Sequence, residues 1–222
     1  MRFLDDVIGL ILPERCAGCA LRQALLCRAC ACRLEGSPRR AWAPEGIPPV
    51  WTSASYEGPV RAVITAHKER GRLPLADPLG RALARAVTHA LDDDNEAGLA
   101  LVPVPSGRGS VRRRGHDATL RIARAAAREL DRGGTAVSVL EALRQRRRVA
   151  DQAGLSRGRR AANLAGALAA RPISEAPGRV VVVDDVITSG ATLREAVRAL
   201  RDVGVSPLAA ATVAATPRLR GR

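Results

Sequence analysis

The stretch VVVVDDVITSGATLREA, residues 180–196, decides the fold that the sequence predicts. Its four valines form a fully apolar run, which is typical of a strand buried on both faces of a parallel sheet. Two aspartates, Asp184 and Asp185, follow the valines, and a helical pattern resumes at Ala191. In open α/β sheets ligands bind beyond the carboxyl ends of such strands, so residues 184–191 are the predicted ligand loop.

The chemistry of this loop points to a sugar phosphate. A helix beginning near Ala191 would direct its first backbone N–H groups and the positive end of its dipole toward a phosphate. The hydroxyls of Thr188, Ser189 and Thr192 would add donors, and Gly190 would let the backbone approach the ligand closely. Two adjacent carboxylates instead suit ribose hydroxyls or waters on a magnesium ion. The alternative is that the two aspartates only cap a turn.

Outward from the loop, strand and helix patterns alternate, which predicts an α/β fold with a mostly parallel sheet flanked by helices. The predicted strands cover residues 50–56, 99–105, 136–140, 180–183 and 207–214. The predicted helices cover residues 59–69, 77–91, 117–130, 156–166 and 191–203. A Pro/Gly-rich connector near residues 34–48 predicts a boundary. We therefore expect an N-terminal unit at 1–48, an α/β domain at 49–217 and a basic tail at 218–222.

All five cysteines lie within CAGCALRQALLCRACAC, residues 16–32. Two residues separate Cys16 from Cys19, and two separate Cys27 from Cys30, and such a pair of knuckles can present four thiolates tetrahedrally to one zinc ion. The spacing therefore predicts a small N-terminal zinc ribbon with a structural Zn²⁺, and it leaves Cys32 outside the ligand set. The alternative of disulfides requires an oxidising compartment, of which the sequence gives no sign.

The chain is strongly basic, with a formal net charge of +14 from 36 basic and 22 acidic residues. Residues 106–160 hold 15 arginines against five acidic residues, so 15 − 5 = +10 of that charge lies there. This favours an anionic partner, such as a phosphorylated metabolite, nucleic acid or an acidic protein surface. Because the segment has no aromatic residue on which single strands could stack, only weak contact with nucleic-acid phosphates is expected. The alternative is that the arginines reflect genome composition.

Other function classes lack their signatures. Neither G-x-x-x-x-G-K-[ST] nor a helix-opening G-x-G-x-x-G occurs, which argues against an ordinary ATPase phosphate loop and a dinucleotide site. No stretch approaches the roughly 18 apolar residues of a membrane span. Asp5 and Asp6 interrupt the only weak resemblance to a signal peptide. The sequence therefore predicts a cytoplasmic protein, and apolar residues at helical spacing over 3–11 predict a helix that packs on the rest of the chain.

Lys68 is the only lysine among the 36 basic residues. If composition alone decided this position, arginine would be expected there too. A compact ammonium differs from a planar guanidinium in reach and geometry, so the exception indicates a place where only lysine works. The alternative is chance survival on a solvated helix face.

Residues 180–192, VVVVDDVITSGAT, closely resemble the phosphoribosyl-pyrophosphate (PRPP) motif of type I phosphoribosyltransferases. Over nearly its full length the chain resembles the ComF family, phosphoribosyltransferase-like proteins linked to DNA uptake in competent bacteria. Further shared features are the four-cysteine ribbon, Tyr56-x-Gly58, Lys68, VPVP at 102–105, RRRG at 112–115, and the run Arg148, Gln152, Leu155, Ser156, Arg160 and Asn163. The family has Phe-Asn-Gln where this chain has His116, Asp117 and Ala118, so His116 and Asp117 inherit no role.

The resemblance implies that Asp184 and Asp185 contact the ribose hydroxyls of PRPP, that Mg²⁺ accompanies it, and that the following loop holds its 5′-phosphate. Lys68 joins the two aspartates as a predicted catalytic residue. The predicted PRPP-binding and phosphate-binding residues are Val186, Ile187, Thr188, Ser189, Gly190, Ala191 and Thr192, with Ser106, Gly107, Arg108 and the arginines at 112–114 on the pyrophosphate side. The acceptor of a phosphoribosyl group is left open. The alternative is a non-catalytic accessory protein of competence or DNA processing that senses a nucleotide or binds nucleic acid and protein partners.

Overall fold

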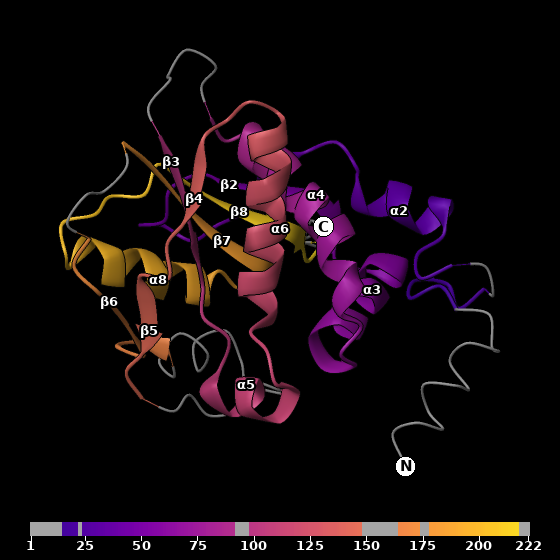
Figure 1. Cartoon of the computed structure of the whole chain (residues 1–222). Helices are drawn as coiled ribbons and strands as arrows, with labels where there is room; N and C mark the ends of the chain where they lie inside the picture. Colours follow the sequence, from indigo (N-terminus) through magenta and orange to yellow (C-terminus); the bar gives the residue numbers. More distant parts are fainter. Residues whose placement is uncertain (1–14, 22–23, 92–97, 148–163, 174–177, 218–222) are drawn as a thin grey trace, which may run out of the picture.

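A six-stranded sheet forms the centre of the molecule (Figure 1). The computed structural model describes residues 15–21, 24–91, 98–147, 164–173 and 178–217. The strands lie in the order β1-β2-β8-β7-β3-β4, and every pair is parallel except β1 with β2. Their bounds are β1 (Arg39–Ala41), β2 (Val50–Ser55), β3 (Leu99–Pro103), β4 (Val137–Val139), β7 (Arg179–Ile187) and β8 (Ala209–Ala215). The prediction of a mostly parallel sheet flanked by helices is confirmed.

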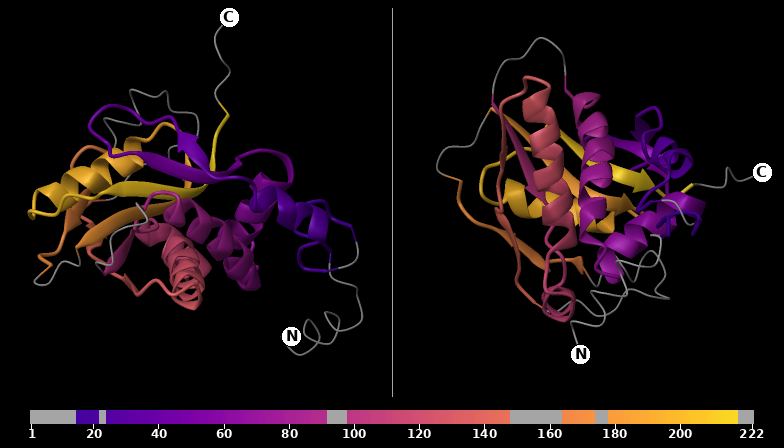
Figure 2. Two further views of the ribbon diagram at one scale, coloured as in Figure 1. Left: turned by 90° about the horizontal axis from the view of Figure 1, so that it is seen from above. Right: turned by 45° about the vertical axis from the view of Figure 1, so that its right-hand side comes forward.

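Helices cover both faces of the sheet. Helices α4 (Ala76–Thr88) and α6 (Ala118–Arg132) lie on one face, and α8 (Ala191–Arg201) lies on the other, as the left view of Figure 2 shows. The valines of β7 alternate between two cores: Val181 and Val183 pack on the α4/α6 side, and Val180 and Val182 pack on the α8 side. This alternation explains why the run is apolar at every position, because a central strand of such a sheet has no solvent face.

Further helices and a second sheet lie beside this layered body. Helices α2 (Arg28–Leu34) and α3 (Gly58–Glu69) lie beside one another, and the short 3₁₀ helix η1 (Leu73–Leu75) precedes α4. Strands β5 (Leu143–Gln145) and β6 (Leu168–Ala170) form an antiparallel pair of their own. The buried carboxylate of Glu195 on α8 accepts a hydrogen bond from the Leu168 backbone N–H at 3.0 Å, which ties this pair to the main body.

The sequence predicted no helix between residues 105 and 117, but the structure places helix α5 (Arg108–Arg114) there. Gly107 precedes this helix and Gly115 ends it with a left-handed φ of 76°. No residue of α5 is buried, so it leaves no apolar periodicity in the sequence. Strand β1 likewise lies within the predicted connector, where it pairs with β2.

None of the described helices combines the length and the apolar composition that a membrane crossing requires. Several predictions concern residues outside the described part of the chain: the N-terminal helix at 3–11, the helix at 156–166 up to Asn163, the run from Arg148 to Asn163, and the tail at 218–222.

Candidate functional site

The two aspartates lie near the carboxyl end of β7, at the start of the predicted ligand loop. Asp185 faces α3, where it meets Lys68. The alternation of the valines does not continue through the pair, because Val186 packs on the α4/α6 side and Ile187 on the α8 side. Both residues are buried, with relative exposures of 9% for Asp184 and 4% for Asp185. Adjacent in sequence, the two carboxylates differ in their partners: Lys68 pairs with Asp185, and the Asp185 backbone N–H donates to Asp184.

Lys68 pairs with one of the two aspartates. The Lys68 Nζ donates to Asp185 Oδ2 at 2.5 Å, across 117 positions of sequence. The lysine side chain is 36% exposed, whereas that of Asp185 is 6% exposed. Burial lowers the pKa of Lys68, but the charges of Asp185 and Asp184 outweigh it and raise that pKa above its usual range. The Lys68 ammonium, in the last turn of α3, is therefore charged at the edge of the sheet where the ligand is predicted to bind.

The surroundings of Asp184 disfavour the charged form of its carboxyl group. Burial first, and then the neighbouring Asp185 carboxylate, raise the pKa of Asp184 well above the usual range, although Lys68 opposes the shift. Its Oδ1 accepts a hydrogen bond from the Asp185 backbone N–H at 2.8 Å. The chain thus holds a carboxyl that is costly to ionise beside one that is already paired with a cation.

This difference predicts the effect of Asp184→Asn, which retains volume and the oxygen acceptor. Between the unfolded Asp pKa of about 3.9 and the raised folded value, the native wild type binds more protons than the unfolded chain, so its stability falls as pH rises. Asparagine does not titrate, so the variant should not lose stability in this way as pH rises. We expect the variant to gain stability over wild type as pH rises from 5 to 8 in urea unfolding. Asp77→Asn, at an exposed position of α4, should show no such gain; an equal pH dependence in both variants would contradict the assignment.

The loop after β7 has the form of a phosphate cradle. Thr188 is exposed, and Ser189 and Thr192 are half-buried, so their hydroxyls are accessible. Gly190, the residue before α8, provides no side-chain cap, and the Ala191 N–H donates to Ser189 Oγ at 3.4 Å. The amides of its first turn and its positive dipole end are therefore directed toward the loop. Val186 is half-buried in β7, while Ile187 packs in the core on the α8 side.

Gly190 is required for a reason that the sequence did not predict. Its φ is +73°, and a Cβ added there would lie 2.5 Å from Cδ of Pro44, in the connector between β1 and β2. Ile47 from the same connector lies next to it, with Cδ1 at 3.5 Å from that position. The missing side chain thus makes room for the connector, in addition to any closeness to a ligand.

Gly190→Ala should therefore destabilise the protein even without a ligand. Gly204→Ala is the matched control, because Gly204 has a φ of +80° and nothing within 4 Å of an added Cβ. Both changes incur the cost of a left-handed alanine, about 1–2 kcal/mol. Only Gly190→Ala adds a clash, for which about 1–3 kcal/mol is expected. Urea unfolding measures the difference, and equal losses would show that Pro44 gives way freely.

The turn after β3 uses its polar groups internally. The N–H and Oγ of Ser106 donate to Oδ2 and Oδ1 of Asp117, both at 2.9 Å, and Asp117 also caps α6 through the Leu120 N–H. The Arg108 N–H donates to Gln145 Oε1 at 3.0 Å, and Gly107 is the residue before α5. Ser106 and Arg108 were predicted to donate to pyrophosphate, but their backbone N–H groups already have partners within the protein. The guanidinium groups of the nearby arginines are therefore the main donors that remain for a ligand.

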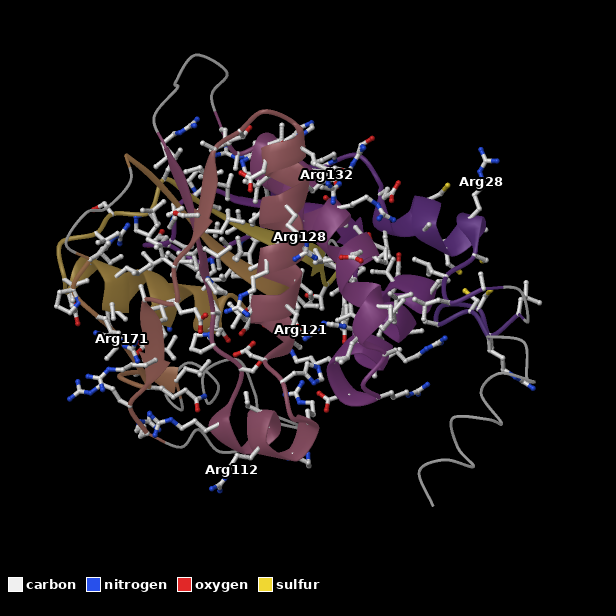
Figure 3. All side chains as sticks on the ribbon, in the orientation of Figure 1. Arg28, Arg112, Arg121, Arg128, Arg132 and Arg171 are labelled. Carbon is white, nitrogen blue, oxygen red and sulfur yellow. The ribbon has the colours of Figure 1, made fainter. Side chains whose placement is uncertain are left out.

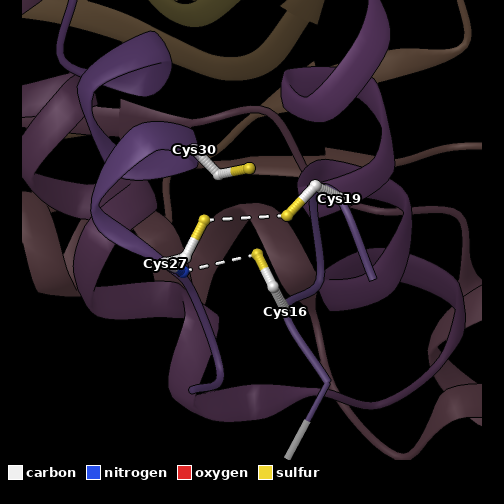
Figure 4. Close-up of side chains that lie close together, drawn as sticks. All are labelled: Cys16, Cys19, Cys27 and Cys30. Atoms are coloured by element: carbon white, nitrogen blue, oxygen red, sulfur yellow. Dashed lines mark hydrogen bonds between the residues drawn. The ribbon is translucent and has the colours of Figure 1, made fainter. Parts of the chain in front are cut away.

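The four predicted zinc ligands come together (Figure 4). The Sγ atoms of Cys16, Cys19, Cys27 and Cys30 all lie within 4.8 Å of one another, and those of Cys19 and Cys27 are 3.7 Å apart. Zinc–sulfur bonds of about 2.3 Å in a tetrahedron separate sulfurs by about 3.8 Å, so the cluster fits one zinc ion. Cys32 is exposed and lies outside the cluster, as the spacing predicted.

The surroundings of Cys16 favour its thiolate, whereas burial and the neighbouring cysteines raise the pKa of Cys30. Cys16 Sγ accepts from the backbone N–H groups of Cys27 at 3.3 Å and Gly18 at 3.4 Å. Burial raises the pKa of Cys16, but these backbone hydrogen bonds outweigh it and lower the pKa to about 6. A Cβ on Gly18 would lie 2.7 Å from Cys30 Sγ, so the knuckle has no space for a side chain there.

Sequence reasoning missed two residues that shape the site. Asp117 organises the turn after β3, and its position before a helical pattern, where an N-cap is favoured, was the available signal. Pro44 had no signal, because its contact with Gly190 joins segments that only the tertiary structure brings together.

Comparison with known families agrees with this geometry. A family model described as the phosphoribosyl transferase domain matches residues 118–222, somewhat less than half of the chain. The match includes both aspartates, the loop at 188–192 and α8, whereas β2, β3 and Lys68 precede it. No curated protein matches the chain. Residues 118–222 therefore carry a phosphoribosyl transferase domain, preceded in the chain by a four-cysteine cluster that fits a zinc ribbon.

Proposed function

We propose that the protein binds PRPP with Mg²⁺ and transfers its phosphoribosyl group to an acceptor. The observation that carries the proposal is the carboxyl end of β7, where a buried acid pair leads into an accessible hydroxyl-rich loop and the uncapped start of α8. Each part suits one part of the ligand: carboxylates suit ribose hydroxyls, and N–H groups and hydroxyls suit the 5′-phosphate. The match to the phosphoribosyl transferase domain supports the same assignment.

The carboxylates also suit a magnesium ion. Asp185 already has a cation, the Lys68 ammonium, at 2.5 Å, so the position beside its oxygen favours positive charge. Asp185 and Asp184 would hold Mg²⁺ through oxygen atoms or through its waters. When bound, the ion would offset the charge of the pyrophosphate leaving group.

In the proposed reaction, a lone pair on the acceptor forms a bond to the anomeric carbon while the carbon–oxygen bond to pyrophosphate breaks. The electron pair of that bond leaves with pyrophosphate, and a proton on the acceptor, where present, passes to solvent. The 188–192 loop fixes the phosphate end, so that the anomeric carbon stays in place as positive charge grows on the ribose. Lys68, whose side chain is partly exposed, would turn its ammonium from Asp185 toward the leaving group when the ligand enters.

Thermal unfolding with PRPP tests the proposal. A ligand that binds only the folded state stabilises it by about 2.7 kcal/mol at a hundred times its dissociation constant, so we expect a rise in melting temperature that requires Mg²⁺. No such rise up to about 1 mM PRPP, the upper range of typical enzyme–substrate pairs, would contradict the site. A rise without pyrophosphate release across a panel of acceptors would retain binding and reject transfer.

The resemblance to the ComF family supports a second proposal, an accessory role in competence through weak nucleic-acid or protein contacts. The labelled arginines in Figure 3 come from α2, α5, α6 and the residue after β6, so they do not share one element. Three arginines of α6 are paired with acids: Arg124 with Glu141, Arg128 with Asp77 and Arg132 with Glu129. These pairs make α6 a poor nucleic-acid surface. Affinity for duplex DNA that survives high salt would favour this second proposal.

A further inference from the structure

The position of the Lys68 ammonium depends on how the last turn of α3 is held. Lys68 lies in that turn, and its flexible four-carbon stem keeps Nζ at 2.5 Å from Asp185 only while its backbone stays in place. The last carbonyl groups of a helix lack partners within the helix, so donors from other elements can bind and fix them. The donor that binds the Lys68 carbonyl therefore bears on the candidate site.

Arg114, the last residue of α5, supplies this donor. Its Nη1 donates to the Lys68 backbone carbonyl at 2.7 Å, and its Nε donates to the Ser110 carbonyl at 3.2 Å. The side chain of Arg114 is only 7% exposed, whereas Arg112 and Arg113 are exposed residues of the same helix. Of the three arginines predicted on the pyrophosphate side, Arg114 thus has its guanidinium engaged by the end of α3.

The residue before the lysine has weaker contacts. His67 is buried, and burial lowers its pKa, which favours the neutral ring. Its Nε2 lies 3.4 Å from the Ala118 carbonyl oxygen at the start of α6, and its Nδ1 lies 3.4 Å from that of Arg72. A neutral imidazole carries one N–H, so it donates to only one of these carbonyls at a time. The Arg114 hydrogen bond, at 2.7 Å, is therefore the firmer attachment of the last turn of α3.

The charge of Arg114 does not explain this contact, because it opposes the Lys68 ammonium. Burial lowers the pKa of Lys68, the two aspartates raise it above its usual range, and the Arg114 charge acts with burial to lower it. Glu69 on α3 attracts the guanidinium, but its Oε1 lies 3.5 Å from Nη1, farther than the Lys68 carbonyl oxygen. Two neighbouring cations repel each other. The benefit of the contact is therefore geometric, because the guanidinium fixes the backbone of a residue whose charge it opposes.

We propose that Arg114 is a positioning residue, which fixes the last turn of α3 so that the Lys68 ammonium stays at the acid pair. The inference rests on the proposed function, because it assigns a residue that prepares Lys68 for that reaction. It also links two sides of the site, because α5 follows the turn at Ser106 on the predicted pyrophosphate side, and Lys68 meets Asp185 on β7. A displacement of about 1 Å in a reacting group can slow a reaction about a hundredfold, so a firm attachment of this turn matters.

The test follows Lys68 by itself, because it is the only lysine in the chain. An amine-acylating reagent reacts with the uncharged amine, and mass spectrometry of the Lys68 peptide gives its rate without any ligand. We expect Arg114→Gln to raise this rate at least about tenfold, because an ammonium that leaves Asp185 loses a charge-assisted hydrogen bond. An effect through charge alone would instead lower the rate, because loss of the guanidinium would raise the pKa of Lys68. Arg113→Gln removes the same charge from an exposed position one residue away and should react as wild type.

A milder variant keeps the test decisive if Arg114→Gln does not fold, which urea unfolding would show. Arg114→Lys retains the charge, but its ammonium ends one bond short of the Nη1 position and cannot bind the Ser110 and Lys68 carbonyls together. We expect its acylation rate at Lys68 to lie between the rates of wild type and of the chain unfolded in urea. A wild-type rate in this variant would overturn the positioning role.

Pyrophosphate release provides the second readout. Arg114→Gln should slow it by about tenfold to a hundredfold, whereas the same change made together with Lys68→Arg should add little, because nothing is left to position. Full additivity of the two changes would assign Arg114 a merely structural role and overturn the proposal. Unchanged or slower acylation in a folded Arg114→Gln would also overturn it and would leave PRPP binding intact. If wild type shows neither a PRPP shift nor pyrophosphate release, the proposed reaction fails, while the acylation rates still decide whether Arg114 positions Lys68.

Discussion

Asp185→Asn should reduce the magnesium-dependent rise in melting temperature that PRPP gives the wild-type protein to less than about half. The change keeps the side-chain volume but removes the charge that Lys68 Nζ contacts at 2.5 Å and that ribose hydroxyls or magnesium waters would meet. Hydrogen bonds to a charged group contribute about 1.5–3 kcal/mol, so the affinity should fall by roughly tenfold to a hundredfold. Without ligand the variant should melt close to wild type, because the lysine is partly exposed and can be hydrated.

Lys68→Arg is the companion test, because it keeps the positive charge. A guanidinium is planar and wider than an ammonium, and it cannot occupy the same space beside the buried Asp185. We expect weaker PRPP binding than in wild type, by about tenfold, and slower pyrophosphate release. Glu69→Gln, at an exposed position next to Lys68 on α3, should leave both unchanged. Wild-type behaviour of Lys68→Arg would mean that any cation suffices.

Loss of zinc is the second large effect, expected when Cys16 and Cys27 are both changed to serine. We expect about one zinc per wild-type chain by elemental analysis, because four thiolates lie close enough for one tetrahedral ion. Structural zinc binding contributes on the order of 10 kcal/mol, far more than the few residues around the cluster could replace by packing. Hydrogen exchange should then rise in α2 and its neighbours more than in the central sheet.

Cys32→Ser is the matched control for zinc, because Cys32 lies on α2 but outside the cluster. It should keep the metal and the wild-type exchange pattern. A double variant at Cys16 and Cys27 that still carries zinc would place the metal elsewhere.

The sequence predicted the central strands and helices because their burial leaves a pattern. The valines of β7 touch helices on both sides, so every position is apolar, and the amphipathic α6 repeats its buried residues every three to four positions. Elements without a buried face could not be predicted in this way. Helix α5 and strand β1 have no buried residue, and β5 and β6 have one each.

The sequence predicted which residues belong to the candidate site better than it predicted how their side chains contact one another. Composition alone singled out Lys68, and the structure brings its ammonium to Asp185. Strand geometry alone does not give the directions of Asp184 and Asp185, because the alternation of the valines does not continue to Val186, which packs on the α4/α6 side, and Ile187, which packs on the α8 side. The hydrogen bonds from Ser106 to Asp117 depend on how the turn after β3 lies against the start of α6. The order of residues alone does not determine this packing.

The connector that carries Pro44 and Ile47 makes the sequence boundary at residue 49 a poor place to cut the chain. A fragment starting there would keep both aspartates and the whole of α8, yet Gly190 would lose the prolyl ring that lies against it. It would also lose β1, which covers the outer edge of β2, and the Gly46 carbonyl that accepts from Arg201 at 2.9 Å at the far end of α8. The segment that joins the cysteine cluster to the sheet thus packs against the loop after β7, and a shortened chain would lose that support at Gly190.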